Sequence, residues 1–128
     1  IFKILKDKRI THGDLGLFNI GYNKKNNKVK LILTDFDRSS NKIYDKNIDF
    51  LRYIIEIDID HQSSANKKIN KFNSEYLLKN IIKISDVLYS QSEYHNLLNK
   101  FNSKKDMIKY WKNKYYKYCK KANVKCAL

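Results

Sequence analysis

Three side chains suited to phosphoryl chemistry stand at short, defined intervals in the first third of the chain. Asn19 follows Asp14 by five residues, and Asp35 follows Asp14 by 21 residues. A carboxylate can accept the proton of an attacking hydroxyl group, and magnesium prefers oxygen ligands of the kind that Asn19 and Asp35 offer. The set therefore meets the needs of phosphoryl transfer from ATP, in which the protein orients the nucleophile and neutralises the developing charge.

The residues between Asn19 and Asp35 predict the element that brings these two side chains together. Two apolar-rich runs, 20–22 and 29–33, flank a polar, turn-forming stretch at 23–28. This pattern indicates a β-hairpin. Because a hairpin returns the chain on itself, we expect Asn19 and Asp35 to become neighbours although they are 16 residues apart in sequence.

The joint pattern H-G-D-L…N…D-F-D resembles the signature of the protein-kinase-like superfamily, H-R-D-L-x-x-x-N followed by D-F-G. The resemblance covers about residues 10–55 and implies the C-terminal lobe of that fold. It implies that Asp14 is the catalytic base and that Asn19 and Asp35 hold magnesium on the ATP phosphates. It also implies a structural role for His12 in the catalytic loop, and a packing role for Phe36 beside the metal ligand.

Two positions depart from the conventional signature. Gly13 replaces Arg, so we expect no basic residue beside the base to pair with an activation-loop phosphate, and no control by such phosphorylation. Asp37 replaces Gly, and we favour a loop residue there over an additional acid beside the metal. The pattern is more similar to a divergent branch of aminoglycoside- and choline-kinase-like enzymes, bacterial effector kinases and poxvirus-type serine/threonine kinases.

A buried helix is predicted over residues 45–57, from apolar residues at helical spacing. They are Ile48, Leu51, Ile54 and Ile55. The resemblance implies that an Asp on this helix accepts hydrogen bonds from the backbone of the catalytic loop, with Asp49 as the first candidate and Asp45 as the second. The alternative role for Asp49 is stabilisation of the helix N-terminus. Only 14 residues separate Asp35 from Asp49 and no A-P-E box is present, so we expect an abbreviated lobe.

The remaining elements are predicted from composition and periodicity. Residues 1–8 read as the end of a helix. Residues 58–72 read as polar and irregular, and His61 with its acidic neighbours there favours a solvated loop over a metal site. Further helices are expected from residue 73 or 74 to about Ser90, then around Tyr94, Leu97, Leu98 and Phe101, and lastly from a Ser103 cap to about Ala122. The last helix should bury Met107, Trp111, Tyr115 and Tyr118.

The chain has a net charge of +14 and a pI of about 9.7. Lysine is spread through the sequence, which favours a solvated basic surface over a nucleic-acid, membrane or acidic-protein interface. Eight lysines lie between residues 104 and 121, but the aromatic residues among them repeat at helical spacing, which favours core packing over stacking on nucleic-acid bases. No apolar run is long enough to span a membrane.

The two cysteines, Cys119 and Cys126, are not spaced as a zinc pair and are too few for a disulfide framework. A reducing intracellular setting fits them, so we expect a cytoplasmic protein, including the host cytoplasm if the chain is viral or an effector. The sequence begins at Ile1, without a glycine-rich phosphate loop or a V-A-I-K lysine before the motif. We therefore expect a fragment that lacks the N-terminal lobe and holds half of an ATP site, which would not be active alone.

Together these observations predict an α+β, mainly helical fold in which residues 1–128 form one protein-kinase-like C-terminal lobe with a small catalytic-loop hairpin. The expected function is ATP- and Mg²⁺-dependent transfer of the γ-phosphate to a hydroxyl group, as in a serine/threonine protein kinase. The expected partners are ATP and a protein substrate. Two alternatives stay open: a small-molecule kinase of the aminoglycoside or choline type, which acts on an alcohol, and an inactive pseudokinase or basic interaction module.

Overall fold

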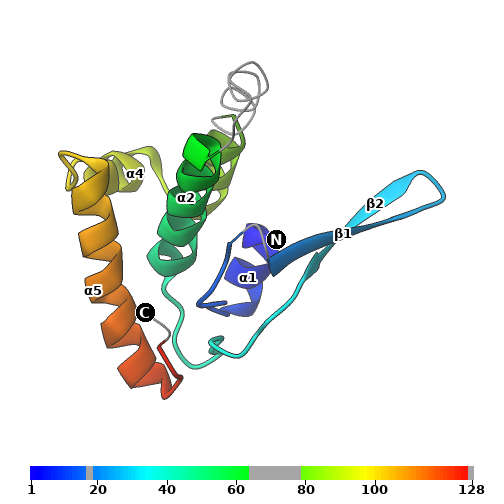
Figure 1. Ribbon diagram of the computed structural model, residues 1–128, viewed down its shortest axis with the longest axis horizontal. Coiled ribbons are helices and arrows are strands. Elements are labelled where there is room, and N and C mark those ends of the chain that lie inside the picture. The colour runs from blue at the N-terminus through cyan, green and yellow to red at the C-terminus, as the bar shows by residue number, and fades with distance from the viewer. Residues whose placement is uncertain (17–18, 64–78, 127–128) are drawn as a thin grey trace.

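The computed structural model describes residues 1–16, 19–63 and 79–126, with the backbone alone described for residues 57–63. A two-stranded hairpin projects from a body of helices (Figure 1). The described elements are, in chain order, α1 (Phe2–Lys8), β1 (Ile20–Lys25), β2 (Lys28–Leu33), α2 (Lys46–Ser63), a helical stretch at 79–88, α4 (Gln91–Leu98) and α5 (Lys104–Ala122). This confirms an α+β, mainly helical chain.

Helices α2 and α5 lie side by side and supply the largest share of the core (Figure 1). The indole Nε1 of Trp111 on α5 donates a 3.0 Å hydrogen bond to the backbone oxygen of Ile48 on α2. The buried apolar side chains of the two helices are Ile48, Phe50, Leu51, Tyr53, Ile55, Trp111, Tyr115, Tyr118 and Cys119. Burial of such side chains is the main favourable contribution to folding.

The predicted beginning and buried face of α5 are confirmed. The hydroxyl of Ser103 accepts a 3.2 Å hydrogen bond from the backbone N–H of Asp106, as an N-cap residue does. Trp111, Tyr115 and Tyr118 are buried, and Met107 is half-buried. The helix therefore turns its aromatic stripe to the core and most of its lysines to solvent.

The β-hairpin is confirmed, with a tighter turn than the sequence predicts. The strands pair antiparallel, from Ile20 opposite Leu33 to Lys25 opposite Lys28. The connection is thus two residues rather than six. Both have positive φ, 53° at Asn26 and 62° at Asn27, the conformation of a type I′ turn, which asparagine tolerates better than most residues.

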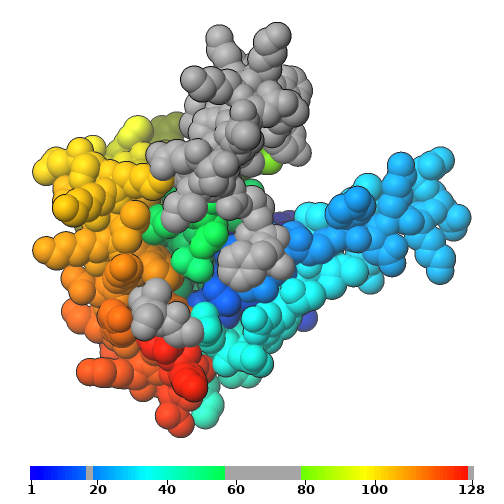
Figure 2. All heavy atoms as spheres, viewed as in Figure 1, coloured from blue at the N-terminus to red at the C-terminus, as the bar shows by residue number. Residues whose placement is uncertain are grey.

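The two faces of the hairpin differ in chemistry. Residues directly opposite each other share a face, and one face carries Tyr22, Val29 and Leu31, which are 74%, 62% and 56% exposed, together with Lys24 opposite Val29. The other face is mostly polar and basic and carries Asn23, Lys25, Lys28 and Lys30. The hairpin stands clear of the body (Figure 2), so its apolar face is open to solvent along most of its length.

Three predicted boundaries need correction. Helix α2 continues to Ser63, so residues 58–63, predicted to be irregular, are helical; the side chain of His61 lies outside the described residues. Helix α4 ends at Leu98, which leaves Phe101 beyond its C-terminus. The helix predicted from residue 73 or 74 is observed at 79–88, and its expected start lies outside the described residues.

Cys119 and Cys126 form a disulfide, contrary to the sequence analysis, which judged two cysteines too few for a disulfide framework and matched them to a reducing setting. Asn123 ends α5 in the left-handed conformation, and the next residue, Val124, donates its N–H to the backbone oxygen of Cys119 at 3.1 Å. This reversal brings Cys126 back to the last turn of α5. Among the helices of the described residues, none combines the length and the apolarity needed to cross a bilayer.

Candidate active site around Asp14

The loop that carries Asp14 is fixed at its start by Thr11. The backbone of Thr11 exchanges two hydrogen bonds with Ser40, of 3.0 and 2.9 Å. Its hydroxyl donates to the carbonyl of Ile43 at 2.8 Å and accepts from the N–H of Asp45 at 2.9 Å. The segment that leads from the hairpin to α2 is therefore joined to the Asp14 loop directly by hydrogen bonds.

Asp49 on α2 holds the next two residues of the loop. Its carboxylate accepts hydrogen bonds from the backbone N–H groups of His12 at 2.8 Å and Gly13 at 2.9 Å. This is the contact that the family resemblance implied for Asp49, and Asp45 does not make it. Burial raises the pKa of Asp49 to about 6, although the two N–H donors favour its charged form and oppose the rise.

His12 connects the loop to the end of the hairpin. Its Nε2 donates to the carbonyl of Thr34 at 2.9 Å, and its Nδ1 accepts from the N–H of Asp14 at 3.2 Å. Phe36 packs edge-on against the imidazole, with the ring centroids 4.9 Å apart, and is 46% exposed. His12 itself is completely buried, so its ring supports the loop from within through these two hydrogen bonds.

Gly13 occupies a position that no other residue fits well. Its φ is 84°, in the left-handed region, and a Cβ added there would collide with the backbone carbonyl of Arg38. An arginine at this position, as in the conventional kinase signature, would meet the same backbone atoms. The glycine is therefore a steric requirement of this loop.

Asp14 is nearly buried, at 7% exposure, and two arginines lie beside it. Arg38 Nη1 is 3.3 Å from Oδ2 of Asp14, and Arg52 Nη2 is 3.7 Å from Oδ1. Arg52 also pairs with Glu56 at 2.9 Å and lies over the Trp111 ring. Two arginines distant in sequence therefore lie beside Asp14, although Gly13 carries no charge; the expectation about pairing with an activation-loop phosphate stays a prediction.

Asn19 is held against Asp14. Its Nδ2 donates to the backbone oxygen of Asp14 at 2.8 Å and to the carboxylate Oδ2 at 3.3 Å. The amide nitrogen thus faces the carboxylate, and the amide oxygen is the atom left for a cation. The five-residue interval in the motif corresponds to a direct contact between the two side chains.

Asp35 lies at the far end of the hairpin from its turn, next to Asn19 in the fold. The preceding residue, Thr34, donates its N–H to the backbone oxygen of Asn19 at 2.9 Å. Asp35 has a φ of 59° and an exposed side chain, and Asp37 is also exposed. The hairpin therefore brings together the backbones of residues 19 and 34, directly before Asp35, whose side chain is exposed.

The donor set is chemically suited to magnesium. Asn19 offers an amide oxygen and Asp35 a carboxylate, both hard oxygen ligands, and magnesium commonly takes its other ligands from water and phosphate. Within the described part of the chain, no group of three or more His, Cys, Asp or Glu side chains could hold a metal ion by itself.

Sequence reasoning missed three residues that shape this site, Arg38, Arg52 and Tyr118. The first directly follows the D-F-D motif, and the second lies one helical turn after Asp49. These spacings are the signals that could have suggested them. Tyr118 comes from the far end of the chain, and no local pattern connects it to the loop.

No family model, no curated protein and no solved structure matches this chain.

Proposed function

We propose that this chain is the catalytic half of an ATP- and magnesium-dependent phosphotransferase with a protein-kinase-like lobe. The single observation that carries the proposal is the contact between Asn19 and Asp14, on a loop whose backbone Asp49 anchors. A structural loop of this length has no need for a buried acid, an amide turned toward it and a further acid at the adjacent strand end. A phosphotransferase needs all three.

In the proposed reaction Asp14 orients the acceptor hydroxyl group and takes its proton. The hydroxyl oxygen forms a bond to the γ-phosphorus of ATP as the bond from that phosphorus to the β,γ-bridging oxygen breaks, and ADP leaves with the bridging oxygen. The proton of the hydroxyl ends on the Asp14 carboxylate. Arg38 and Arg52 stabilise the negative charge of that carboxylate before the proton arrives and fix its orientation.

Asn19 and Asp35 are the residues proposed to hold magnesium. When bound, magnesium would neutralise charge on the β- and γ-phosphates. Asn19 has a second task in this scheme, because its Nδ2 holds the Asp14 carboxylate while its amide oxygen would be left to bind the cation. Asp35 projects from an exposed position, where a nucleotide's phosphates can reach it.

The open face of the hairpin supports a nucleotide beside these residues. Tyr22 and Leu31, which pair with each other, present exposed apolar surface two residues along the strands from the Ile20–Leu33 pair that adjoins Asn19 and Thr34. A purine ring is flat and largely apolar, so it gains by covering such a surface. In this proposal the base and the phosphates of the nucleotide would lie at one side of the same hairpin.

The acceptor is proposed to be a serine or threonine hydroxyl of a protein. A small-molecule alcohol is the second candidate, and the short segment after Asp35 favours it. Residues 36–39 form a tight turn, closed by a 3.0 Å hydrogen bond from the Ser39 N–H to the Phe36 carbonyl. The residues that follow are hydrogen-bonded to Thr11. So short a segment leaves little chain on which to dock an extended peptide.

The test measures transfer from ATP labelled at the γ-phosphate, using the protein encoded by the complete reading frame. Acceptors are a mixture of basic and acidic proteins in one arm, and choline and aminoglycosides in the other. Asp35→Asn should abolish transfer, and Asp14→Ala should slow it by about 10²–10⁴-fold while ATP still binds. Asp37→Asn is the matched control and should keep most of the activity.

Retained transfer in a correctly folded Asp35→Asn protein would sink the assignment. Absence of turnover in the wild type, with salt-dependent binding to nucleic acid or protein instead, would support the inactive interaction module. Transfer to choline or an aminoglycoside without transfer to any protein would select the second candidate acceptor.

A further inference from the structure

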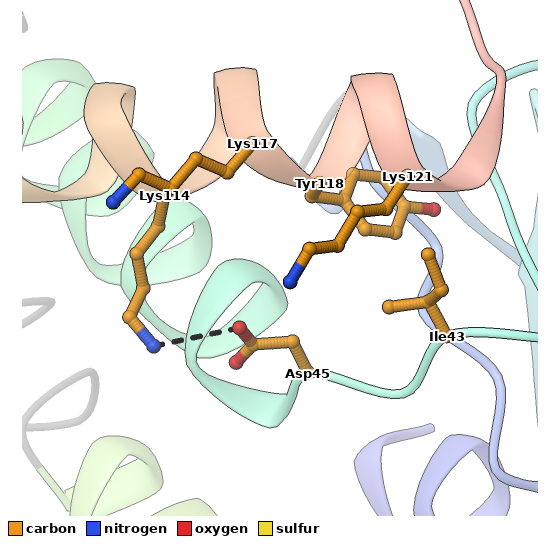
Figure 3. Close-up of a pocket in the computed structure, with 6 residues that line it drawn as sticks. All are labelled: Ile43, Asp45, Lys114, Lys117, Tyr118 and Lys121. Atoms are coloured by element: carbon orange, nitrogen blue, oxygen red, sulfur yellow. Dashed lines mark hydrogen bonds and ion pairs between the residues drawn. The ribbon is translucent and has the colours of Figure 1, made fainter.

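A basic cavity lies between α5 and the segment that enters α2. It has a volume of about 220 Å³. Figure 3 shows α5 above the cavity and Asp45 below it, with lysine side chains reaching from the helix. The lining residues are Ile43, Asp45, Lys114, Lys117, Tyr118 and Lys121.

Asp45, the acidic residue of this cavity, already has a partner for each carboxylate oxygen. Oδ1 of Asp45 accepts a 3.0 Å hydrogen bond from the N–H of Asn47 at the start of α2, and Oδ2 pairs with Lys114 Nζ at 3.4 Å. Lys117 and Lys121 are exposed, and no ion pair joins either to an acid among the residues that the structure describes. The cavity is thus lined by two lysines, Lys117 and Lys121, in excess of its internal ion pair.

The side chains also give the cavity a shape and an apolar wall. Lys114 and Lys121 both extend from α5 toward Asp45, while Lys117 runs along the helix (Figure 3). Ile43 and the ring of Tyr118 form the wall at the opposite end. A ligand with a small apolar part next to an anionic group would match both the apolar wall and the lysine-lined side of the cavity.

We propose that this cavity binds the phosphate group of a phosphorylated serine or threonine side chain on a peptide. Lysine ammonium groups bind phosphate as strong charge-assisted donors, and a dianion gains more from two of them than a carboxylate does. The cavity is smaller than the roughly 300–1,000 Å³ of sites that enclose drug-sized ligands, so one phosphorylated side chain fits it better than a nucleotide. The excess positive charge of the chain would attract such a peptide from a distance.

A ligand bound in this cavity would affect the position of the Asp14 loop. Ile43 and Asp45 both bond to the Thr11 hydroxyl, and Tyr118 donates to the backbone carbonyl of Arg38 at 2.6 Å. Residues that line the cavity therefore also hold the backbone around the loop in place. This site does not depend on the phosphotransferase proposal, because it uses none of the residues assigned to that reaction.

The test titrates the ¹⁵N-labelled chain with a short, otherwise neutral phosphoserine peptide at about 0.15 M ionic strength, near physiological screening. We expect saturable shifts in the amide signals of residues 43–45 and 114–121, with inorganic phosphate competing and the unphosphorylated peptide inert. The double variant Lys117→Gln/Lys121→Gln should bind the peptide at least about tenfold more weakly, as loss of two charge-assisted hydrogen bonds implies.

The matched control is Lys112→Gln/Lys120→Gln, which removes the same charge from exposed positions of α5 outside the cavity. It should bind the peptide as the wild type does. An equal loss in both double variants would overturn the proposal, because binding would then follow net charge alone. Tighter binding of a single-stranded oligonucleotide at the same signals would overturn it in favour of a nucleic-acid site.

Discussion

The hydroxyl group of Tyr118 donates a 2.6 Å hydrogen bond to the backbone carbonyl of Arg38, the residue whose guanidinium pairs with Asp14. The same hydroxyl lies 3.5 Å from the backbone oxygen of Thr11. Burial raises the pKa of Tyr118 above its ordinary value, so the phenol keeps its proton for these contacts. The last helix of the chain thereby fixes the backbone on both sides of the Asp14 loop.

We first predict that Tyr118→Phe lowers the free energy of unfolding by about 1–2 kcal/mol, because it leaves the Arg38 carbonyl without its donor while the ring still packs. Urea denaturation followed by circular dichroism measures the change. Tyr116→Phe is the control, since Tyr116 lies on the same helix and is 46% exposed. Equal effects of the two variants would show that the hydroxyl of Tyr118 contributes nothing particular to stability.

The second prediction concerns the glycine beside Asp14. Gly13→Ala should destabilise the chain by about 1–3 kcal/mol, because the residue has a φ of 84° and a methyl group would displace the Arg38 carbonyl. Gly21→Ala is the matched control, because a Cβ there would come no closer than 4.0 Å to the carbonyl of Ile32. Thermal unfolding of the two variants compares them. A Gly13→Ala protein as stable as Gly21→Ala would contradict the close approach of the two loops.

The third prediction is a pH dependence that originates at Asp49. Its pKa of about 6 in the folded chain lies above the ordinary value of 3.8, so between these two pH values the folded state binds more protons than the unfolded state. Stability from this group is therefore full below pH 4 and falls as pH rises toward about 6, by roughly 3 kcal/mol in all.

Comparison of the wild type with Asp49→Asn isolates that contribution. At low pH the hydroxyl oxygen of the protonated Asp49 carboxyl can still accept from the second N–H group, whereas the asparagine NH2 cannot, so the variant should be less stable there. It does not titrate, however, and the difference in unfolding free energy should shift in its favour between pH 4 and 6. Urea titrations at half-unit pH steps measure this shift. A difference that stays constant with pH would refute the raised pKa.

Local patterns predicted the parts of the fold that depend on neighbours in sequence. The hairpin, the Ser103 cap and the buried stripe of α5 follow from alternation, capping chemistry and helical spacing. The end of α2 did not, because residues 58–63 carry few apolar side chains although they contain no glycine or proline to stop a helix. Once a helix is nucleated, each further residue adds a hydrogen bond at little cost.

The environment of Asp14 was predictable only in part. The five-residue interval marked Asp14 and Asn19 as members of one motif, and the resemblance implied the role of Asp49 from its place on the following helix; the direct contact between Asp14 and Asn19 emerged only in the fold. Arg38, from a loop, and Arg52, from α2, both reach the Asp14 carboxylate. Their positions relative to Asp14 depend on how the loop and the helix pack together. A short interval in sequence can mark the members of one motif, whereas side chains that meet through different elements need the fold.

The final prediction concerns the disulfide between Cys119 and Cys126. The bond closes a short loop, with a sequence separation of 7, and in the chain-entropy model it stabilises the folded state by about 2 kcal/mol. Reduction should therefore lower the midpoint of thermal unfolding of the wild type. Cys126→Ser, which cannot form the bond, should unfold at the lower temperature with or without reductant, since Cys126 is only half-buried. A wild-type midpoint that does not respond to reductant would mean that the reversed C-terminal turn is held by packing and by the Val124–Cys119 hydrogen bond alone.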